Sequence, residues 1–159
     1  MVTILTSALP RQTKKPGNIE IRFVMACEGN FQAILAKLML KTTGPQGVHG
    51  CVLWTGAKSD AKAKVIYGRV VNPFPDTGVK RIFAHKAIFY LNEGHSPAVG
   101  EGEIDGETGS VYEISHLCHT PLCVNINHLV REPHAVNLER IHCKQQGHCT
   151  RAHMPPCLL

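Results

Sequence analysis

The chain has 159 residues, a formal net charge of +5 at neutral pH and 43% hydrophobic residues. This length favours one compact domain with a modest apolar core, which bound metal ions would help to stabilise. The longest apolar run, residues 33–40, is interrupted by Lys37 and is far too short to cross a membrane. The positive charge fits a polyanionic partner, although basic proteins without such a partner are also common.

The first residues differ in character from the rest of the chain. Residues 1–17 end in Pro16-Gly17 and contain several lysines and arginines. We interpret them as a basic N-terminal arm, either a disordered tail or an arm that contacts phosphate. Their apolar residues precede the charges, the reverse of a secretory signal, so we expect an intracellular, reducing compartment, and the nucleus in a eukaryotic cell. Residues 18–159 are expected to fold as a single domain.

The next elements are predicted from apolar spacing and from turn residues. Apolar residues recur at helical spacing over residues 30–41, which predicts a helix there. Residues 43–47, TGPQG, predict a turn. The strand that follows begins near Cys51 and carries Trp54, the only tryptophan, as an expected core residue.

Two basic strands are predicted in the middle of the chain, over residues 65–71 and 79–83, and the second runs into a helix over residues 84–91. A two-stranded ribbon fits the major groove of DNA, so we interpret residues 51–109 as a DNA-binding β-sheet half. The candidate contacts are Lys58, Lys62, Lys64, Arg69, Lys80 and Arg81. The alternative is a solvated strand face, which is where most lysines and arginines lie.

The second half of the domain is predicted to begin after an exposed loop. Residues 91–109 are rich in glycine and acidic residues, which predicts that loop. Residues 110–116 alternate between polar and apolar side chains, which predicts a strand that ends at His116.

The last quarter of the chain concentrates potential metal ligands. Residues 115–157 contain five of the seven cysteines and seven of the ten histidines. Soft ligands at short spacings are typical of tetrahedral zinc sites, whereas disulfides, the alternative, do not need interleaved histidines. We predict two structural zinc sites, the first formed by Cys51, Cys118, Cys123 and His128, and the second by Cys143, Cys149, His153 and Cys157.

Two of these ligand assignments have alternatives. The local stretch of the first group supplies three ligands and a closed structural site needs four, which favours Cys51 as a ligand over a buried free cysteine. In the second group His148 competes with His153, which lies four residues beyond Cys149.

A helix is predicted between the two groups, because Pro133 suits its first turn and Glu132 lies near its positive end. Asn137 falls in the middle of this helix, where asparagine is a mediocre helix former. It is either an exposed surface amide or an oxygen ligand for a hard cation such as magnesium.

The run Ser115-His116-Leu117-Cys118-His119, followed by Cys123, Asn125, His128-Leu129 and Asn137, resembles the His-Cys box homing endonucleases. These belong to the ββα-metal (His-Me finger) nucleases. The resemblance implies an α+β fold, a small mixed domain with an antiparallel sheet, a ββα-metal nuclease core within residues 110–157 and two structural zinc sites.

The resemblance also implies roles for individual residues. His116 would activate the attacking water, Asn137 would bind a catalytic Mg²⁺, and an arginine would steady the scissile phosphate. Arg69 is the preferred candidate for that arginine, followed by Arg81 and then Arg140.

The activity expected from this resemblance is site-specific, Mg²⁺-dependent hydrolysis of phosphodiester bonds in double-stranded DNA, as in intron homing. The enzyme would act as a homodimer on a near-palindromic site. The alternatives are a catalytically inactive zinc-dependent DNA-binding module and a treble-clef-like protein-interaction domain.

Overall fold

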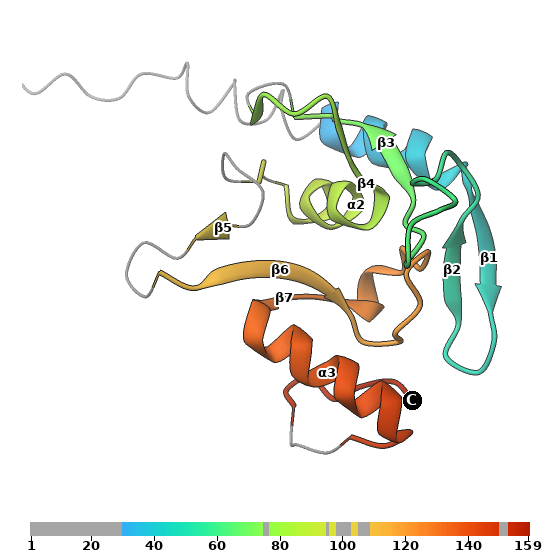
Figure 1. Cartoon of the computed structure of the whole chain (residues 1–159). Helices are drawn as coiled ribbons and strands as arrows, with labels where there is room; N and C mark the ends of the chain where they lie inside the picture. The colour runs from blue at the N-terminus through green and yellow to red at the C-terminus, as the bar shows by residue number, and fades with distance from the viewer. Residues whose placement is uncertain (1–29, 75–76, 95, 98–102, 105–108, 150–152) are drawn as a thin grey trace, which may run out of the picture.

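The computed structural model describes residues 30–74, 77–94, 96–97, 103–104, 109–149 and 153–159. These residues form a small mixed α+β domain in which short antiparallel sheets pack with helices (Figure 1). The predicted fold class is therefore confirmed, whereas the predicted basic arm lies outside the described residues. None of the helices in the described part of the chain has the length and apolarity needed to span a bilayer.

The N-terminal part of the described chain is a helix followed by a hairpin. The helix covers residues 30–39, close to the predicted range. Strand β1 (Thr42–Gln46) pairs antiparallel with β2 (Cys51–Trp54). The turn predicted over residues 43–47 is wrong, because the turn falls on residues 47–50 instead. The Gly-Pro pair that suggested the turn lies in β1, where the register with β2 is irregular. An edge strand tolerates proline because a proline, which lacks an N–H, can stand where no neighbouring strand would accept a hydrogen bond from it.

The two basic strands are present but short. Strand β3 (Arg69–Val71) pairs antiparallel with β4 (Arg81–Phe83), and α2 (Ala84–Glu93) follows β4 directly. The predicted strand over residues 65–71 is therefore too long at its start. At Gly68 an added Cβ would lie 2.5 Å from the Trp54 ring. The chain thus passes against Trp54 just before β3 begins, which only glycine permits.

The third sheet contains the elements that surround the site described below. Its strands β5 (Glu103–Ile104), β6 (Val111–His116) and β7 (Leu129–Pro133) are arranged antiparallel in the order β5-β6-β7. The prediction of β6 is confirmed. Strand β7 was not predicted; it follows the short 3₁₀ helix η2 (Ile126–His128). The predicted C-terminal helix is α3 (His134–Gln146), which ends at Gly147 in the left-handed conformation.

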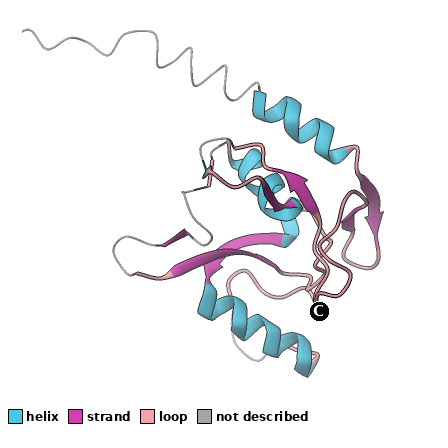
Figure 2. Cartoon of the chain, turned by 45° about the horizontal axis from the view of Figure 1, so that its top comes forward, coloured by secondary structure: helices cyan, strands magenta, loops and turns pink. Residues whose placement is uncertain are grey.

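Helix α2 organises the apolar core. One buried cluster brings Trp54 and Val70 against the first turns of α2, and a second brings Phe74, Ile114 and Leu129 against its later turns. Two views show β6 and β7 between α2 on one side and α3 on the other (Figures 1 and 2). The end of β6 is therefore held by packing on both sides.

Candidate active site and metal centres

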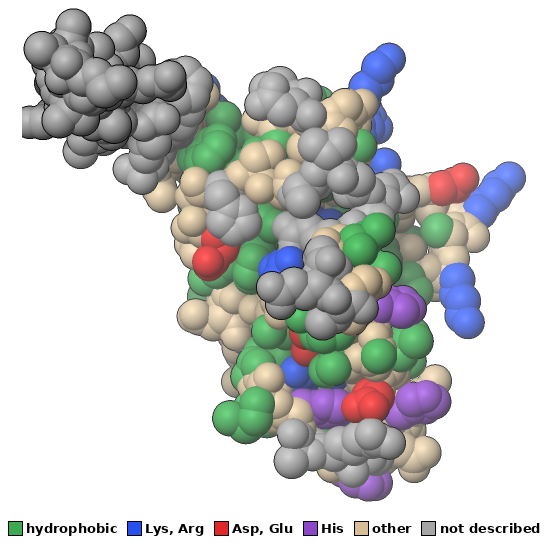
Figure 3. All heavy atoms as spheres, turned by 90° about the vertical axis from the view of Figure 1, so that its left-hand side faces the viewer, with side chains coloured by type: hydrophobic (Ala, Val, Ile, Leu, Met, Phe, Trp, Pro, Cys, Tyr) green, Lys and Arg blue, Asp and Glu red, His purple; other side chains and the backbone are tan. Residues whose placement is uncertain are grey.

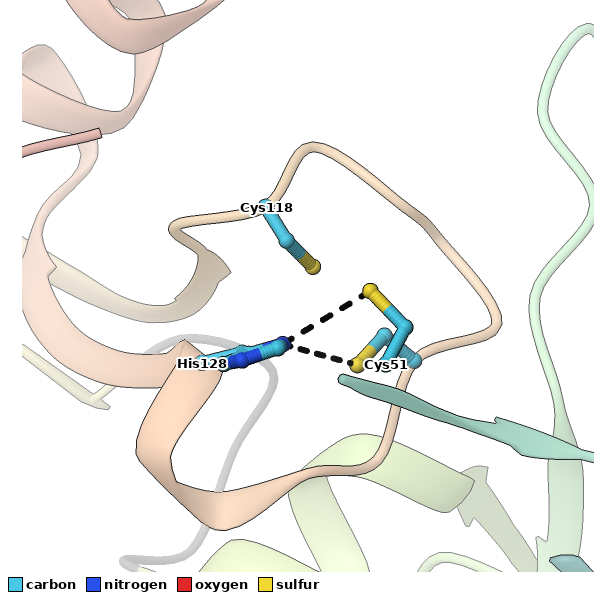
Figure 4. A group of neighbouring side chains, drawn as sticks. Cys51, Cys118 and His128 are labelled. Atoms are coloured by element: carbon cyan, nitrogen blue, oxygen red, sulfur yellow. Dashed lines mark hydrogen bonds between the residues drawn. The ribbon is translucent and has the colours of Figure 1, made fainter. Parts of the chain in front are cut away.

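The four residues predicted for the first zinc site lie together. Their ligand atoms all lie within 4.8 Å of one another, and the group consists of Cys51, Cys118, Cys123 and His128. The Nδ1 atom of His128 is 3.7 Å from the Cys51 sulfur and 3.4 Å from the Cys123 sulfur. Figure 4 shows Cys51, Cys118 and His128 converging from three segments of the chain. Three thiols and one imidazole form a donor set that could hold a zinc ion in a closed tetrahedral site.

Backbone pairing explains why Cys51 reaches a group of residues so distant in sequence. The backbone N–H of Trp54 donates to Leu122 O at 2.9 Å, and the N–H of Val124 donates to Val52 O at 2.8 Å. The Asn125 side chain adds a hydrogen bond from Nδ2 to Gly50 O at 2.9 Å. Strand β2 is thus tied to the ligand-bearing loop along its length, which places Cys51 as the fourth member of the group.

The neighbouring Cys123 thiol shifts the pKa of Cys118. A hydrogen bond from the Cys123 thiol, opposed by burial, lowers the pKa of Cys118 well below its ordinary value. A lowered pKa favours the thiolate form of Cys118, which is the form that binds zinc.

The four residues predicted for the second zinc site also lie together, with their ligand atoms within 4.8 Å of one another: Cys143, Cys149, His153 and Cys157. Cys143 is the only one of them in α3, and its sulfur is 3.3 Å from Nε2 of the buried His153. His148 is exposed, and its Nδ1 lies 3.1 Å from Gln146 O. The structure thus places His153, not His148, in this group. None of the six cysteines in the described residues forms a disulfide.

Arg140 joins the second group to the β6–β7 hairpin. Its side chain is 1% exposed, and its Nε lies 2.8 and 2.9 Å from the two carboxylate oxygens of Glu132 on β7. The same carboxylate accepts a hydrogen bond from the Ser115 hydroxyl on β6. The Arg140 guanidinium also donates to Pro155 O at 2.9 Å and to the Cys157 sulfur at 3.4 Å. A guanidinium buried in this way does not face a phosphate, so Arg140 is not retained as a phosphate-binding candidate.

A cavity of about 330 Å³ lies beside the end of β6. Side chains from β6, α2, α3, the loop after β6 and the segment before β3 line it, including Tyr67, His85, Glu113, His116, His119 and Asn137. Two residues that the resemblance singled out, His116 and Asn137, therefore share one concave site.

His116, the last residue of β6, is fixed by the loop that carries the first cysteine group. Its Nε2 lies 2.9 Å from the carbonyl oxygen of Cys123. A carbonyl only accepts hydrogen bonds, so Nε2 carries the proton and Nδ1 carries the lone pair. Burial lowers the pKa of His116, which favours its neutral form.

His85 is a site residue that the sequence reasoning missed. It lies in the first turn of α2, is 4% exposed, and its ring centroid is 4.5 Å from that of His116. Burial lowers the pKa of His85 well below its usual value, and the charge of His116 adds to the shift. Its Nδ1 is buried without a hydrogen-bond partner among the described residues. A histidine on the buried face of a helix otherwise resembles a core residue, so only its contact with His116 identifies it.

Asn137 faces a carboxylate across the cavity wall. Its Nδ2 donates to Glu113 Oε2 at 2.7 Å, and His134 Nδ1 lies 3.0 Å from the same oxygen. Burial alone would raise the pKa of Glu113, but the hydrogen bonds from Asn137 and His134 outweigh it and lower the pKa. Asn137 is thus part of a polar contact between β6 and α3, not an isolated surface amide.

His119 lies in the wall of the cavity. Its φ of 52° is in the left-handed region, and its Nε2 is buried without a hydrogen-bond partner among the described residues. The carbonyl of His119 accepts a hydrogen bond from Lys144 Nζ at 3.1 Å. This bond fixes the loop between two members of the first cysteine group against α3.

The residues predicted to contact DNA do not all lie on strands of the sheet. Lys58, Lys62 and Lys64 are exposed in the loop before β3, not on a strand face. Arg81 is exposed on β4, and the Arg69 guanidinium stacks 4.8 Å from the Phe83 ring centroid. Lysine and arginine side chains project from one edge of the molecule, while histidines gather lower on the same face (Figure 3). Lys80 is likewise exposed, just before β4.

Arg69 is near the cavity but does not form part of its wall. Phe83, on which its guanidinium stacks, lines the cavity together with Lys86 and Lys144. The two lysines were not among the predicted contacts. They add positive charge at the cavity itself, where a phosphate group would be attracted.

The family model described as the zinc-binding loop region of homing endonuclease matches residues 50–157. The match covers more than half of the chain and includes every member of both cysteine–histidine groups. Neither a search of curated proteins nor a search of solved structures found a match. This family supports a nuclease or DNA-binding role. The chain belongs to the homing endonuclease zinc-binding loop family.

Proposed function

We propose that the protein is a Mg²⁺-dependent endonuclease that hydrolyses phosphodiester bonds in double-stranded DNA. The observation that carries this proposal is the pairing of His116 with Asn137 in one cavity, with the Nε2 atom of His116 tied to the Cys123 carbonyl at 2.9 Å. Hydrolysis needs a base for water, neutralisation of the charge that develops on the phosphate, and a fixed position for the backbone.

His116 supplies the base. Because Nε2 is used as a donor to Cys123, Nδ1 is the nitrogen that accepts the proton of the attacking water. The water oxygen forms a bond to phosphorus, the bond from phosphorus to O3′ breaks, and O3′ takes a proton from solvent. The products have 5′-phosphate and 3′-hydroxyl ends. The ring of His85 packs against that of His116 and restricts its orientation.

Asn137 would hold the magnesium ion. Its Nδ2 already donates to Glu113, so Oδ1 is the amide atom available to a cation. Oxygen is the donor that Mg²⁺ prefers, and Mg²⁺ commonly takes only one or two protein ligands. When bound, the ion would supply positive charge at the phosphate.

The zinc ions proposed for the two cysteine–histidine groups would be structural, because four protein ligands leave no open coordination position. The first group would also position the base, since Cys123 contributes its sulfur to that group and its carbonyl to His116. Loss of that zinc would therefore disturb the active site directly.

The remaining roles are assigned to the two halves of the chain. We assign DNA binding to residues 51–109, with Arg69 steadying the scissile phosphate, and the chemistry to residues 110–157. The exposed lysines and arginines described above support this division. A homodimer on a near-palindromic site would cut both strands with two copies of the cavity.

Cleavage of supercoiled plasmids tests this function. The substrate is a library of plasmids with random inserts, incubated with zinc-loaded protein in Mg²⁺ or EDTA. His116→Ala and Asn137→Ala should each abolish nicking, whereas the exposed α3 residues His142→Ala and Gln145→Ala should leave it unchanged.

A mobility shift at several salt concentrations distinguishes the proposal from its alternatives. The nuclease and the inactive DNA-binding module both predict binding that weakens steeply with salt, because phosphate contacts release counterions. Binding without Mg²⁺-dependent nicking would favour the inactive module. Absence of both would favour a protein-interaction domain.

A further inference from the structure

We propose that Glu113 is a positioning residue that fixes the Asn137 amide so that its oxygen, not its nitrogen, is presented to a divalent cation in the cavity. This inference rests on the proposed function of Asn137. It assigns a second residue to the cation site, on a different element and without direct contact to the ion.

An asparagine side chain needs such a device if it is to bind a cation. Its amide has an oxygen acceptor at one end and a nitrogen donor at the other, and rotation by half a turn exchanges them. Only the oxygen can bind a cation. An unrestrained amide would therefore present the wrong atom for part of the time.

The contact with Glu113 selects one of these two orientations. An ionised carboxylate accepts hydrogen bonds and does not donate them, so the Asn137 atom 2.7 Å from Glu113 Oε2 must be the nitrogen. The reverse orientation would place two oxygens in contact, which is repulsive. The oxygen of Asn137 is thereby left for the cavity, which both residues line.

Glu113 is itself held on both sides. It lies within β6, where its Cα is paired with that of Glu132 on β7. His134, the first residue of α3, approaches Glu113 Oε2 at 3.0 Å. Since Asn137 is one turn further along α3, the same carboxylate contacts two successive turns of that helix. This arrangement fixes the distance between the strand that carries His116 and the helix that carries Asn137.

We assign Glu113 a role through Asn137, because its Oε2, the oxygen that faces α3, is already occupied by Asn137 and His134. This distinction can be tested by substitution. In Glu113→Gln a carbonyl oxygen remains to accept the hydrogen bond, but the charge is lost. In Glu113→Ala both the acceptor and the charge are lost.

The first measurement is the dissociation constant of Mn²⁺ for zinc-loaded full-length protein in the absence of DNA. Electron paramagnetic resonance reports the free and bound Mn²⁺. Glu113→Ala should weaken Mn²⁺ binding by about 10–100-fold, the usual effect of removing a residue that orients a metal ligand. Glu113→Gln should weaken Mn²⁺ binding by less than Glu113→Ala, because the glutamine oxygen can still accept from Asn137, although its amide, unlike a carboxylate, can also turn to donate. Glu93→Ala, at the exposed end of α2, is the control for loss of one negative charge. An unchanged dissociation constant in Glu113→Ala, or an equal loss in Glu113→Gln, would overturn the inference.

A reversal of the hydrogen bond gives a second test that does not depend on cleavage. Asn137→Asp places two carboxylates face to face and should lower the melting temperature of the Mg²⁺-free protein. Adding Glu113→Gln gives a glutamine amide that can donate to the new aspartate carboxylate, which is the reverse of the original hydrogen bond. The double variant should therefore regain the melting temperature, and its aspartate should bind Mn²⁺. Simple additivity of the two substitutions would contradict the proposed contact.

These experiments separate the inference from the proposed function. Intact Mn²⁺ binding with the predicted Glu113 pattern, but no plasmid cleavage, would refute the nuclease and leave the positioning role standing. A wild-type protein that binds no Mn²⁺ would overturn the cation role of Asn137 and this inference together.

Discussion

Replacing Arg140 with methionine should destabilise the zinc-loaded protein by about 3–5 kcal/mol. Methionine keeps an unbranched apolar side chain but removes the guanidinium, which is 1% exposed and contacts both oxygens of Glu132 at 2.8 and 2.9 Å. Among the described residues, the Glu132 carboxylate, 5% exposed, would then keep only the Ser115 hydroxyl as a donor. A buried charge without its partner is costly because the protein interior cannot replace the lost solvation. The expected loss is a large part of the ~5–15 kcal/mol that stabilises a typical domain.

A double-mutant cycle isolates the ion pair from the lost packing. Glu132→Gln removes the charge but leaves an acceptor for Ser115. The double variant Arg140→Met, Glu132→Gln should therefore be more stable than Arg140→Met alone, by about 2 kcal/mol, because it contains no unpaired buried charge. The free energy of unfolding is measured by urea titration at saturating zinc. Trp54, the only tryptophan and 2% exposed, reports the transition by fluorescence.

Two results would refute this reasoning. A loss of less than about 1 kcal/mol in Arg140→Met would mean that the Glu132 charge is solvated in the folded protein. If the loss of stability in the double variant equalled the sum of the losses in the two single variants, the two side chains would not be energetically coupled, despite their short distance.

Three further predictions concern metal content, packing and pH. Cys51→Ser should lower the zinc content by one ion per chain in mass spectrometry, because it removes one of the four members of the first group; unchanged zinc content would exclude Cys51 as a ligand. Gly68→Ala should cost about 1–3 kcal/mol in urea unfolding, because the new Cβ would lie 2.5 Å from Trp54, whereas Gly44→Ala meets nothing within 4 Å and should be nearly neutral. Burial lowers the pKa of His85 in the folded state, so as the pH falls this histidine is protonated in the unfolded state at a higher pH than in the folded state. The free energy of unfolding should therefore decrease as the pH drops below about 6.5. His85→Phe should reduce this pH dependence, and an identical slope in both proteins would show that His85 is already protonated or solvated.

Local chemistry explains which parts of the structure the sequence predicts. Helix α3 was predicted from Pro133, a residue whose effect acts within one turn, and the structure has Pro133 directly before the first residue of this helix. The second cysteine group follows from short spacings in a single stretch, although spacing left His148 as an alternative to His153. Cys51 required only the additional argument that a structural zinc site has four ligands.

The missed features depend on contacts between distant segments. Strand β7 is short and contains an acidic residue and a proline, so it becomes a strand only because β6 supplies its hydrogen-bond partners. Glu132 was therefore placed near the start of a helix, whereas the fold buries it on β7 against Arg140. In the same way, His85 and Glu113 carry no local signal, and each gains a role only by contact with His116 or Asn137.

The two cysteine–histidine groups differ in how they can form while the chain is being made. In the second group, Cys143 and His153 are only 10 residues apart, so this group can close almost as soon as its residues leave the ribosome. In the first group, Cys51 must wait for His128, which is 77 residues later. At about 5–20 residues per second, the delay is roughly 4–15 s. During that interval the Cys51 thiol lacks the His128 partner. A zinc ion bound by the first group would connect the two halves of the domain only after residues 118–128 have arrived.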